Sequence, residues 1–365
     1  DHRLLGVGQD GDNWGANGYA IRGANLAVLN SGVLQAGGPN GVNAVHFTGG
    51  TNTLTLEAGS SITGQVVADG TNDALILGGD GPGIGQFNMG GIYLGFEVFE
   101  KRGAGTWRTT GTGSGTLTSI DVLEGELQSG SHSALNVNVA AGASLTGGGT
   151  VGDVFIADQG IIAPSVPNQP NTVDTLTMSS LTLSNGSLVN FDLGWPWPGA
   201  SEKIVVTGGL TLNGTLNVAE RPGFGSVANN GVYTLIEYGS LVADNGLLLG
   251  TLPAGYSYEI GVGTVVANAV TLTVATVTGN QFWDGASQTS GTIEGGSGVW
   301  NASNTNWTNA AGSSNAAWQG EFAIFGGAAG TVTVEGTQAF TGMQFLTNGY
   351  TLAAGTGGLL DADAA

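Results

Sequence analysis

The chain has 365 residues, of which 41% are hydrophobic, only 9% are charged and 68 are glycine. A high apolar content with so little charge excludes a disordered chain, and 9 prolines without a strict glycine period exclude collagen. The 27 acidic and 7 basic residues give a net charge of −20, which excludes nucleic acid as a partner because phosphate binding needs clustered basic side chains.

The sequence contains no cysteine. A secreted chain of this size has the option of disulfides, and their absence fits a chain that crosses a narrow pore unfolded. The chain begins at Asp1 without an initiator Met, and it shows neither a signal peptide nor an apolar run of about 18 residues. We therefore expect the sequence to be a piece of a longer exported protein.

Short apolar runs with alternating side chains predict β-strands along most of the chain, separated by turns rich in Gly, Asn, Ser and Asp. The first clear repeat aligns Leu54 with Leu75 at a step of 21 residues. Further along, we expect Val137 to align with Ile156 at a step of 19, and Ile156 with Met178 at a step of 22. Strands that recur about every 20 residues predict a stacked solenoid, because each turn buries its apolar face only against its neighbours.

One longer interval, from Leu181 to Leu210, measures 29 residues. It contains the stretch 194–201, whose two prolines cannot donate to a strand ladder. We expect this stretch to leave the coil as a loop insertion, and removing its eight residues restores a step of 21.

The segment Phe96–Trp107 resembles the unit F-x-x-F-x-K-x-G-x-G-T-W of bacterial autotransporter passengers. It is followed by Val122–Leu127, similar to V-x-x-G-x-L, and by Val137–Val151, similar to V-x-x-G-A-x-L-x-G-x-G-T-V. Residues 160–164 and 201–206 resemble G-x-x-x-P and S-D-K-I-V-V in the same order. The shared order over about 150 residues is more specific than any one string.

This resemblance implies an all-β chain folded as a right-handed parallel β-helix, a solenoid of about 20-residue rungs. It also implies export through the periplasm to the bacterial surface, with membrane attachment only through a C-terminal β-barrel that this sequence does not contain. Residues 283–352 are similar to another passenger repeat, so we expect one β-helix segment over 1–275 and a second block over 276–365, continuing or kinked.

Enzymes that act on polysaccharides also adopt the β-helix fold, so the ionisable residues are candidate catalytic groups. The densest acidic group is Asp69, Asp73 and Asp80. All three flank Gly/Asn turns and are expected to bond locally to the backbone. The histidines are far apart in sequence: His2, His46 and His132. We expect them to be solvated or strand-face residues, and we expect no catalytic site.

Two stretches look superficially like calcium loops. Residues 10–13 lack the distal Glu of an EF-hand loop, and residues 78–81 lack the repetition of calcium-binding β-rolls. We therefore expect neither a metal site nor a cofactor.

Trp195 and Trp197 are the candidate binding residues, because two indoles on a proline-stiffened loop could present flat apolar faces to a sugar or a protein groove. The alternative, which the residues favour slightly, is that both cover a flank of the coil. The tryptophans assigned to the structural core are Trp107, Trp300, Trp307 and Trp318.

The function expected from the resemblance is adhesion to host cells or matrix, or self-association between passengers, without catalysis. The partner would be a protein or glycan of the host, or a second passenger. Two alternatives stay open: a glycan-active β-helix enzyme, and a structural stalk that displays another domain. An enzyme would gather at least three ionisable side chains in one groove, whereas an adhesin would scatter its acids.

Overall fold

The computed structural model describes most of the chain. The described residues are 18–36, 43–111, 117–130, 135–165, 174–194, 201–221, 231–253, 256–276, 279–285, 292–313 and 315–362. All regular elements in these ranges are β-strands, which confirms the expected all-β class for this part of the chain. The same residues form no helix that could span a membrane.

The chain divides into two compact units. The first comprises Asp1–Leu252 with Glu259–Thr273, and the second comprises Pro253–Tyr258 with Val274–Ala365. Each unit has its own core.

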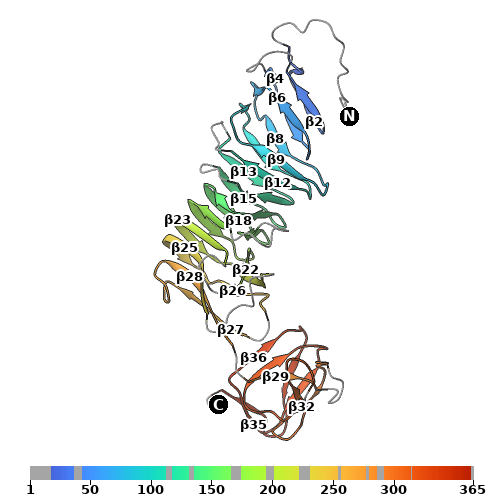
Figure 1. Cartoon of the computed structure of the whole chain (residues 1–365), viewed down its shortest axis with the longest axis vertical. Helices are drawn as coiled ribbons and strands as arrows, with labels where there is room; N and C mark the ends of the chain where they lie inside the picture. Colours follow the sequence, from blue (N-terminus) through green and yellow to red (C-terminus); the bar gives the residue numbers. More distant parts are fainter. Residues whose placement is uncertain are drawn as a thin grey trace. The chain divides into compact units, whose positions relative to one another are not determined.

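The first unit is built around two long sheets (Figure 1). The larger is 14-stranded, and its strands follow the order β2 (Ala27–Asn30), β5 (Thr53–Leu56), β8 (Ala74–Leu77), β11 (Val98–Lys101), β13 (Ser119–Val122), β15 (Asn136–Val139), β18 (Asp153–Ile156), β21 (Ser180–Leu183), β23 (Lys203–Leu212), β25 (Gly231–Asp244), β28 (Ala269–Thr276) and β27 (Tyr256–Val262), with β17 (Gly149–Thr150) and β20 (Thr175–Met178) on a branch. The second has eight strands: β9 (Ile84–Asn88), β12 (Thr106–Thr110), β14 (Glu126–Gln128), β16 (Ser144–Thr146), β19 (Ile161–Ala163), β22 (Leu188–Leu193), β24 (Thr215–Glu220) and β26 (Leu248–Leu249).

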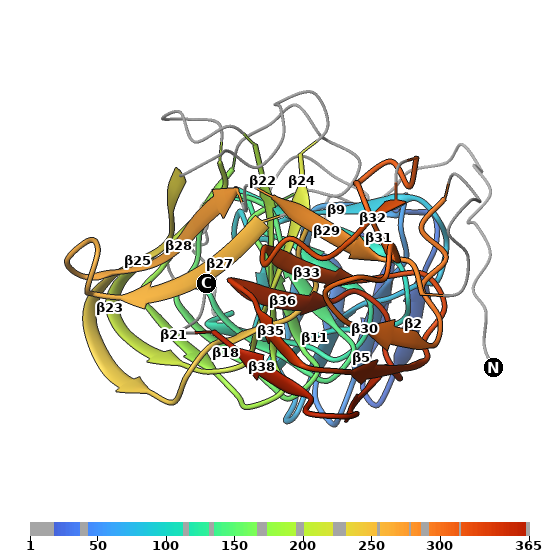
Figure 2. The ribbon, with the colours of Figure 1, turned by 90° about the horizontal axis from the view of Figure 1, so that it is seen from below.

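Two smaller sheets complete this unit near its N-terminal end. They contain β1 (Ile21–Gly23), β4 (Asn43–Phe47), β7 (Gln65–Ala68) and β10 (Tyr93–Leu94) in one sheet, and β3 (Val33–Gln35) and β6 (Ser61–Thr63) in the other. In the view of Figure 2 the strands of the large sheets lie behind one another, as their sheet order requires. A set of strands, one from each sheet, is called a rung below.

Neighbouring strands in these sheets pair in parallel at the expected kind of interval. Leu54 pairs with Leu75, and Leu181 pairs with Leu210 across the longer interval, so both predicted alignments are confirmed. The chain also returns on itself around the predicted insertion, because Leu193 and Ser201 form an isolated antiparallel bridge.

Two other predicted alignments are wrong. Val137 pairs with Val154, not with Ile156, and Ile156 pairs with Leu183, not with Met178. The first error is a shift of two residues, which an alternating apolar pattern cannot reveal because either register keeps the same side chains inside. The second arises because two adjacent apolar strands, β20 and β21, both pair with the ten-residue strand β23.

The core of the first unit consists of apolar columns that run from rung to rung. One column in the larger sheet contains Leu54, Leu75, Phe99, Ile120, Val137, Val154, Leu181 and Leu210, all buried. The facing column of the eight-stranded sheet contains Trp107, Leu127, Leu145, Ile162, Val189 and Leu216. Burial of each such side chain contributes about 1.5–3 kcal/mol, and no rung buries its column without a neighbour.

The second unit also stacks parallel strands. Three pairs of strands do so: β33 (Phe322–Phe325) with β36 (Gly342–Phe345), β34 (Thr331–Val334) with β37 (Thr351–Ala354), and β35 (Thr337–Ala339) with β38 (Leu359–Asp361). The remaining strands are β29 (Asn280–Trp283), β30 (Gly298–Trp300), β31 (Trp307–Thr308) and β32 (Asn315–Ala316). Its core is aromatic and contains Trp283, Trp300, Trp307, Trp318 and Phe325.

Candidate interaction surface

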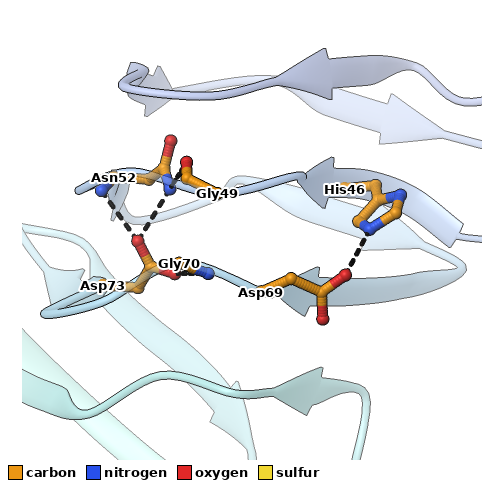
Figure 3. A network of polar contacts seen from close by, with 6 residues as sticks. All are labelled: His46, Gly49, Asn52, Asp69, Gly70 and Asp73. Carbon is orange, nitrogen blue, oxygen red and sulfur yellow. Dashed lines mark hydrogen bonds and ion pairs between the residues drawn. The ribbon is translucent and has the colours of Figure 1, made fainter.

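A hydrogen bond between a histidine and an exposed carboxylate joins two rungs near the N-terminal end of the first unit. His46 lies on β4, and its Nε2 is 2.8 Å from Oδ2 of Asp69, which follows β7 (Figure 3). The His46 side chain is 18% exposed and that of Asp69 is 59% exposed. His46 thus lies on a strand face, as expected. An ion pair this open to solvent contributes at most about 1 kcal/mol.

A buried carboxylate bridges the same two rungs at their turns. Oδ1 of Asp73 accepts hydrogen bonds from the backbone N–H and the side-chain Nδ2 of Asn52, at 2.8 and 2.7 Å, while its Oδ2 accepts the N–H of Gly70 (Figure 3). Asp73 and Asn52 are 0% and 1% exposed. Only the bond from Gly70 is the local turn bond that the sequence predicted. The two bonds from Asn52 join residues that are 21 positions apart in the chain.

Other acidic side chains connect rungs in the same way. Oε2 of Glu97 accepts the N–H of Asp73 at 2.7 Å, and Oδ1 of Asp80 accepts the N–H of Ala104 at 2.7 Å. These carboxylates satisfy backbone donors in the turns between strands, where the strand ladders are interrupted. Their role in this part of the chain is structural.

Lys101 is fully buried at an inward-facing position, between Leu77 and Val122 on the neighbouring strands. Its ammonium donates to the backbone carbonyls of Arg102, Gly103 and Glu124, at 3.0, 2.5 and 3.0 Å. Burial lowers the pKa of Lys101 to about 8, and the nearby carboxylates partly oppose that shift. Lys101 is the lysine of the segment Phe96–Trp107 that resembles the autotransporter repeat. The sequence alone predicted no role for it.

The outer face of the larger sheet carries a mixed column of side chains. It runs through Thr55, Ile76, Glu100, Asp121, Asn138, Phe155 and Thr182. Asn138 Nδ2 donates to Oδ1 of Asp121 at 2.8 Å, and in the adjoining column Ser180 Oγ donates to Oδ1 of Asp153 at 2.7 Å. The outer face therefore offers short polar and apolar groups at each rung, in a regular array.

The eight-stranded sheet carries a denser polar network on its outer face. Glu126 accepts hydrogen bonds from the hydroxyls of Thr106 and Thr146, one rung on either side, at 3.0 and 2.5 Å. Arg108 donates from Nε and Nη2 to Oε1 of Gln128, at 3.1 and 2.8 Å. Gln128 and Thr146 are buried, the other groups are partly buried, and together they connect three rungs.

A buried charged group lies where the chain leaves β22 and β24. Oε1 of Glu202 is 3.6 Å from Nη1 of Arg221, and Oε2 of Glu202 accepts the N–H of Asp192 at 2.9 Å. The Glu202 and Arg221 side chains are 1% and 2% exposed. Burial raises the pKa of Glu202 to about 8, with that N–H opposing the shift. Three ionisable residues thus lie close together here, of which Glu202 and Arg221 are enclosed and Asp192 is partly exposed.

Several predicted residues lie outside the described part of the chain. They are the candidate binding residues Trp195 and Trp197, His2, His132 and the loop 10–13. The four tryptophans assigned to the core, Trp107, Trp300, Trp307 and Trp318, are buried, at 8% exposure or less, which confirms that assignment. The described residues include no group of three or more His, Cys, Asp or Glu side chains that could hold a metal ion.

Comparison with known proteins supports the resemblance read from the motifs. No family model matches the chain. It is 38% identical over 210 residues to the adhesin BmaC autotransporter of Brucella suis biovar 1 (strain 1330). The match covers 54% of this chain and only 6% of that much longer protein. The predicted resemblance to autotransporter passengers of the adhesin type is therefore confirmed over about half of the chain.

Proposed function

We propose that this chain is a non-catalytic segment of an autotransporter passenger that acts at the bacterial surface, in adhesion to host cells or matrix or in association between passengers. The 38% identity to an autotransporter adhesin carries this proposal. That relative's name describes a protein of which the match spans 6%, so the adhesive role of this segment is inferred from a small part.

The finer fold within this proposal is a right-handed parallel β-helix with rungs of about 20 residues. Parallel strands follow one another at such intervals in the larger sheet, as in the pairing of Leu54 with Leu75. Each connection crosses from one sheet through another and returns to the first, and crossovers between parallel strands of one sheet are right-handed in about 98% of cases.

The mechanism follows from repetition. A stacked fold holds the polar and apolar groups of its outer columns at a spacing of about 4.8 Å along the coil. Each group contributes a weak contact, and many weak contacts on one rigid scaffold add through effective concentration. A host glycan, a matrix protein or the same face of another passenger could supply the partner groups. Trp195 and Trp197 stay proposed as an additional contact.

Adhesion is proposed ahead of the glycan-active enzyme because of where the ionisable groups lie. Glu202 and Arg221, the ionisable pair beside Asp192, have side chains only 1–2% exposed, so a polysaccharide chain in solvent has no access to this pair. The ammonium of Lys101, near Asp80, Glu124 and Glu126, is buried against three backbone carbonyls and is enclosed as well. The exposed pair of His46 and Asp69 joins two rungs and has no third titratable partner within hydrogen-bonding distance among the described residues.

The test uses beads coated with the purified full chain, applied to cultured host cells and to matrix-coated wells. Saturable retention, competed by soluble chain, is the expected result, with albumin-coated beads as the control. Sedimentation over a wide concentration range tests self-association in parallel. The proposal fails if the chain neither retains beads nor self-associates. A Trp195→Ala/Trp197→Ala double variant that loses retention would assign the contact to that loop.

A further inference from the structure

A hollow of about 160 Å³ opens in the first unit at the corner between the two large sheets, beside β8, β9 and β12. Its lining comes from three successive rungs. The lining side chains are Glu57, Ala58, Asp80, Thr106 and Trp107, together with the backbone of Gly78, Gly79, Gly81, Gly83 and Gly105.

The hollow has a clear origin in the chain. Residues 57–60 and 102–105 cross this corner in four residues, whereas the rung between them uses six, 78–83. At the same level the strand order is interrupted among the described strands, because β6 pairs with β3 while β9 is the terminal strand of the eight-stranded sheet. A longer, glycine-rich turn at a break in the ladder therefore leaves space that no side chain fills.

The wall of the hollow is held in place by hydrogen bonds between rungs. Nε1 of Trp107 donates to the carbonyl of Gly78 at 2.8 Å, and the N–H of Gly105 donates to the carbonyl of Gly79 at 3.0 Å. Oδ1 of Asp80 accepts the N–H of Ala104 at 2.7 Å. A ligand entering the hollow meets a preformed surface and need not order it, which reduces the entropic cost of binding.

The chemistry of the lining restricts the ligand. Glu57 and Asp80 supply carboxylate oxygens from two consecutive rungs, and Ala58 supplies an exposed methyl group. Trp107 adds only the small part of its side chain that is not buried, and the hydroxyl of Thr106 lines the hollow while it donates to Glu126. Among the described residues no basic side chain lines the hollow, and the nearby ammonium of Lys101 is buried against three carbonyls. Sulfated, phosphorylated or carboxylated ligands are therefore repelled.

We propose that this hollow, named the corner hollow, binds one neutral hexose unit of a glycan. The proposal rests on the adhesive function proposed above and assigns it a ligand class and a site. The carboxylates of Glu57 and Asp80 accept hydrogen bonds from hydroxyls spread around one ring, and the ring's C–H surface packs on the apolar wall. A lysine from a protein partner presents only one compact charge, which matches acceptors on two rungs less well.

The test fills the corner hollow without disturbing the coil. A Cβ at Gly83 meets nothing closer than Ala58 Cβ at 4.0 Å, and a Cβ at Gly81 meets no atom within 4 Å. Gly83→Val therefore places its Cβ without a close contact, and its methyl groups narrow the hollow. Gly32→Val is the matched control, because a Cβ there also meets no atom within 4 Å and Gly32 does not line the hollow. Glu57→Gln provides a second variant that keeps the shape and removes the charge.

The probes are glucose, galactose, mannose and their neutral disaccharides, with a lysine-rich peptide as competitor, measured by ligand-observed NMR on the full chain. We expect at least one sugar to bind the wild type and Gly32→Val, and its affinity to fall by about tenfold or more in Gly83→Val and Glu57→Gln. Equal binding in all four proteins, or binding of the peptide alone, overturns the proposal. A chain that retains beads on cells or matrix but binds no neutral sugar contradicts the corner hollow alone. A chain that neither retains beads nor self-associates contradicts the proposed function.

Discussion

Trp107 occupies the space that a side chain at Gly85 would need. The two residues pair across β12 and β9, and a Cβ built at Gly85 would lie 2.4 Å from the indole ring. The largest side chain of this rung is thus accommodated by the smallest residue of the rung before it. The size of the residue at 85 therefore controls the position of the Trp107 ring.

Gly85→Ala should displace this indole and destabilise the first unit. Overpacking of this kind costs about 1–3 kcal/mol, so we expect a lower urea midpoint by circular dichroism. Gly32→Ala serves as the control, because its Cβ would meet no atom within 4 Å and its midpoint should not change. Identical midpoints for the two variants would contradict the packing described here.

Asp73 and Asp69, only four residues apart, should respond very differently to alanine. Asp73→Ala leaves the buried N–H of Asn52 without its acceptor, and it removes one of the two bonds of Asn52 Nδ2 and the bond from the partly exposed N–H of Gly70. One unsatisfied buried group alone costs about 1–3 kcal/mol. Asp69→Ala removes one exposed pair with His46 and should cost less than about 1 kcal/mol. Urea midpoints of the two variants measure the difference. A larger effect at Asp69 would refute this reading of the turns.

Lys101→Met should be strongly destabilising although it replaces a charged residue by an apolar one in the core. The substitution leaves three carbonyls without the donor that they now share, which we expect to cost about 2–4 kcal/mol. Lys203→Met is the matched control, since Lys203 forms a partly exposed pair with Glu237 that contributes less than about 1 kcal/mol. Hydrogen exchange of the amides around Lys101 would report the loss locally. Unchanged protection there would argue against a structural role.

Stability should fall as the pH rises toward 8 because of Glu202. Its pKa is about 8 in the folded chain against 4.5 for the unperturbed group, so the folded state keeps a proton that the unfolded chain releases. The stability that this proton contributes is fully present below pH 4.5. It falls as the pH rises from 4.5, by at most about 1.4 kcal/mol per pH unit, and is lost as the pH passes through 8.

The corresponding measurement compares urea midpoints at several pH values between 5.5 and 8. Glu202→Gln should show a smaller decline than the wild type, because its side chain does not titrate. Glu237→Gln, a change at a partly exposed ion pair, should decline as the wild type does. Parallel declines in all three proteins would show that another group is responsible.

The fold class and the approximate interval between rungs could be predicted from the sequence, because alternation of apolar residues and glycine-rich turns are local signals. The pairing of Leu54 with Leu75 was predicted in this way. The pairing of Val137 with Val154 was missed by two residues, because alternation is identical after such a shift. The register at that point depends on the number of residues in each turn between strands. The spacing of apolar residues does not reveal that number.

The polar contacts of the candidate surface were less predictable. Asp73 has the local signature of a turn residue, and only its spacing of 21 residues from Asn52 indicates a bond between rungs. Lys101 interrupts an apolar column, and that interruption was the available sign of a buried, fully bonded amine. The corner hollow depends on a turn that is two residues longer than its neighbours, so it requires the correct register before it can be recognised.

The bonds between rungs also bear on how such a chain can change in length during evolution. Asp73 bonds to Asn52, and Glu97 bonds to Asp73, because the partners lie on neighbouring rungs, 21 and 24 residues apart. Duplication or deletion of one whole rung leaves such partners on neighbouring rungs, whereas gain or loss of a few residues within a strand would shift that rung against both of its neighbours. We therefore expect a gene of this kind to lengthen by copying complete rungs, and to accept shorter insertions in the turns between strands.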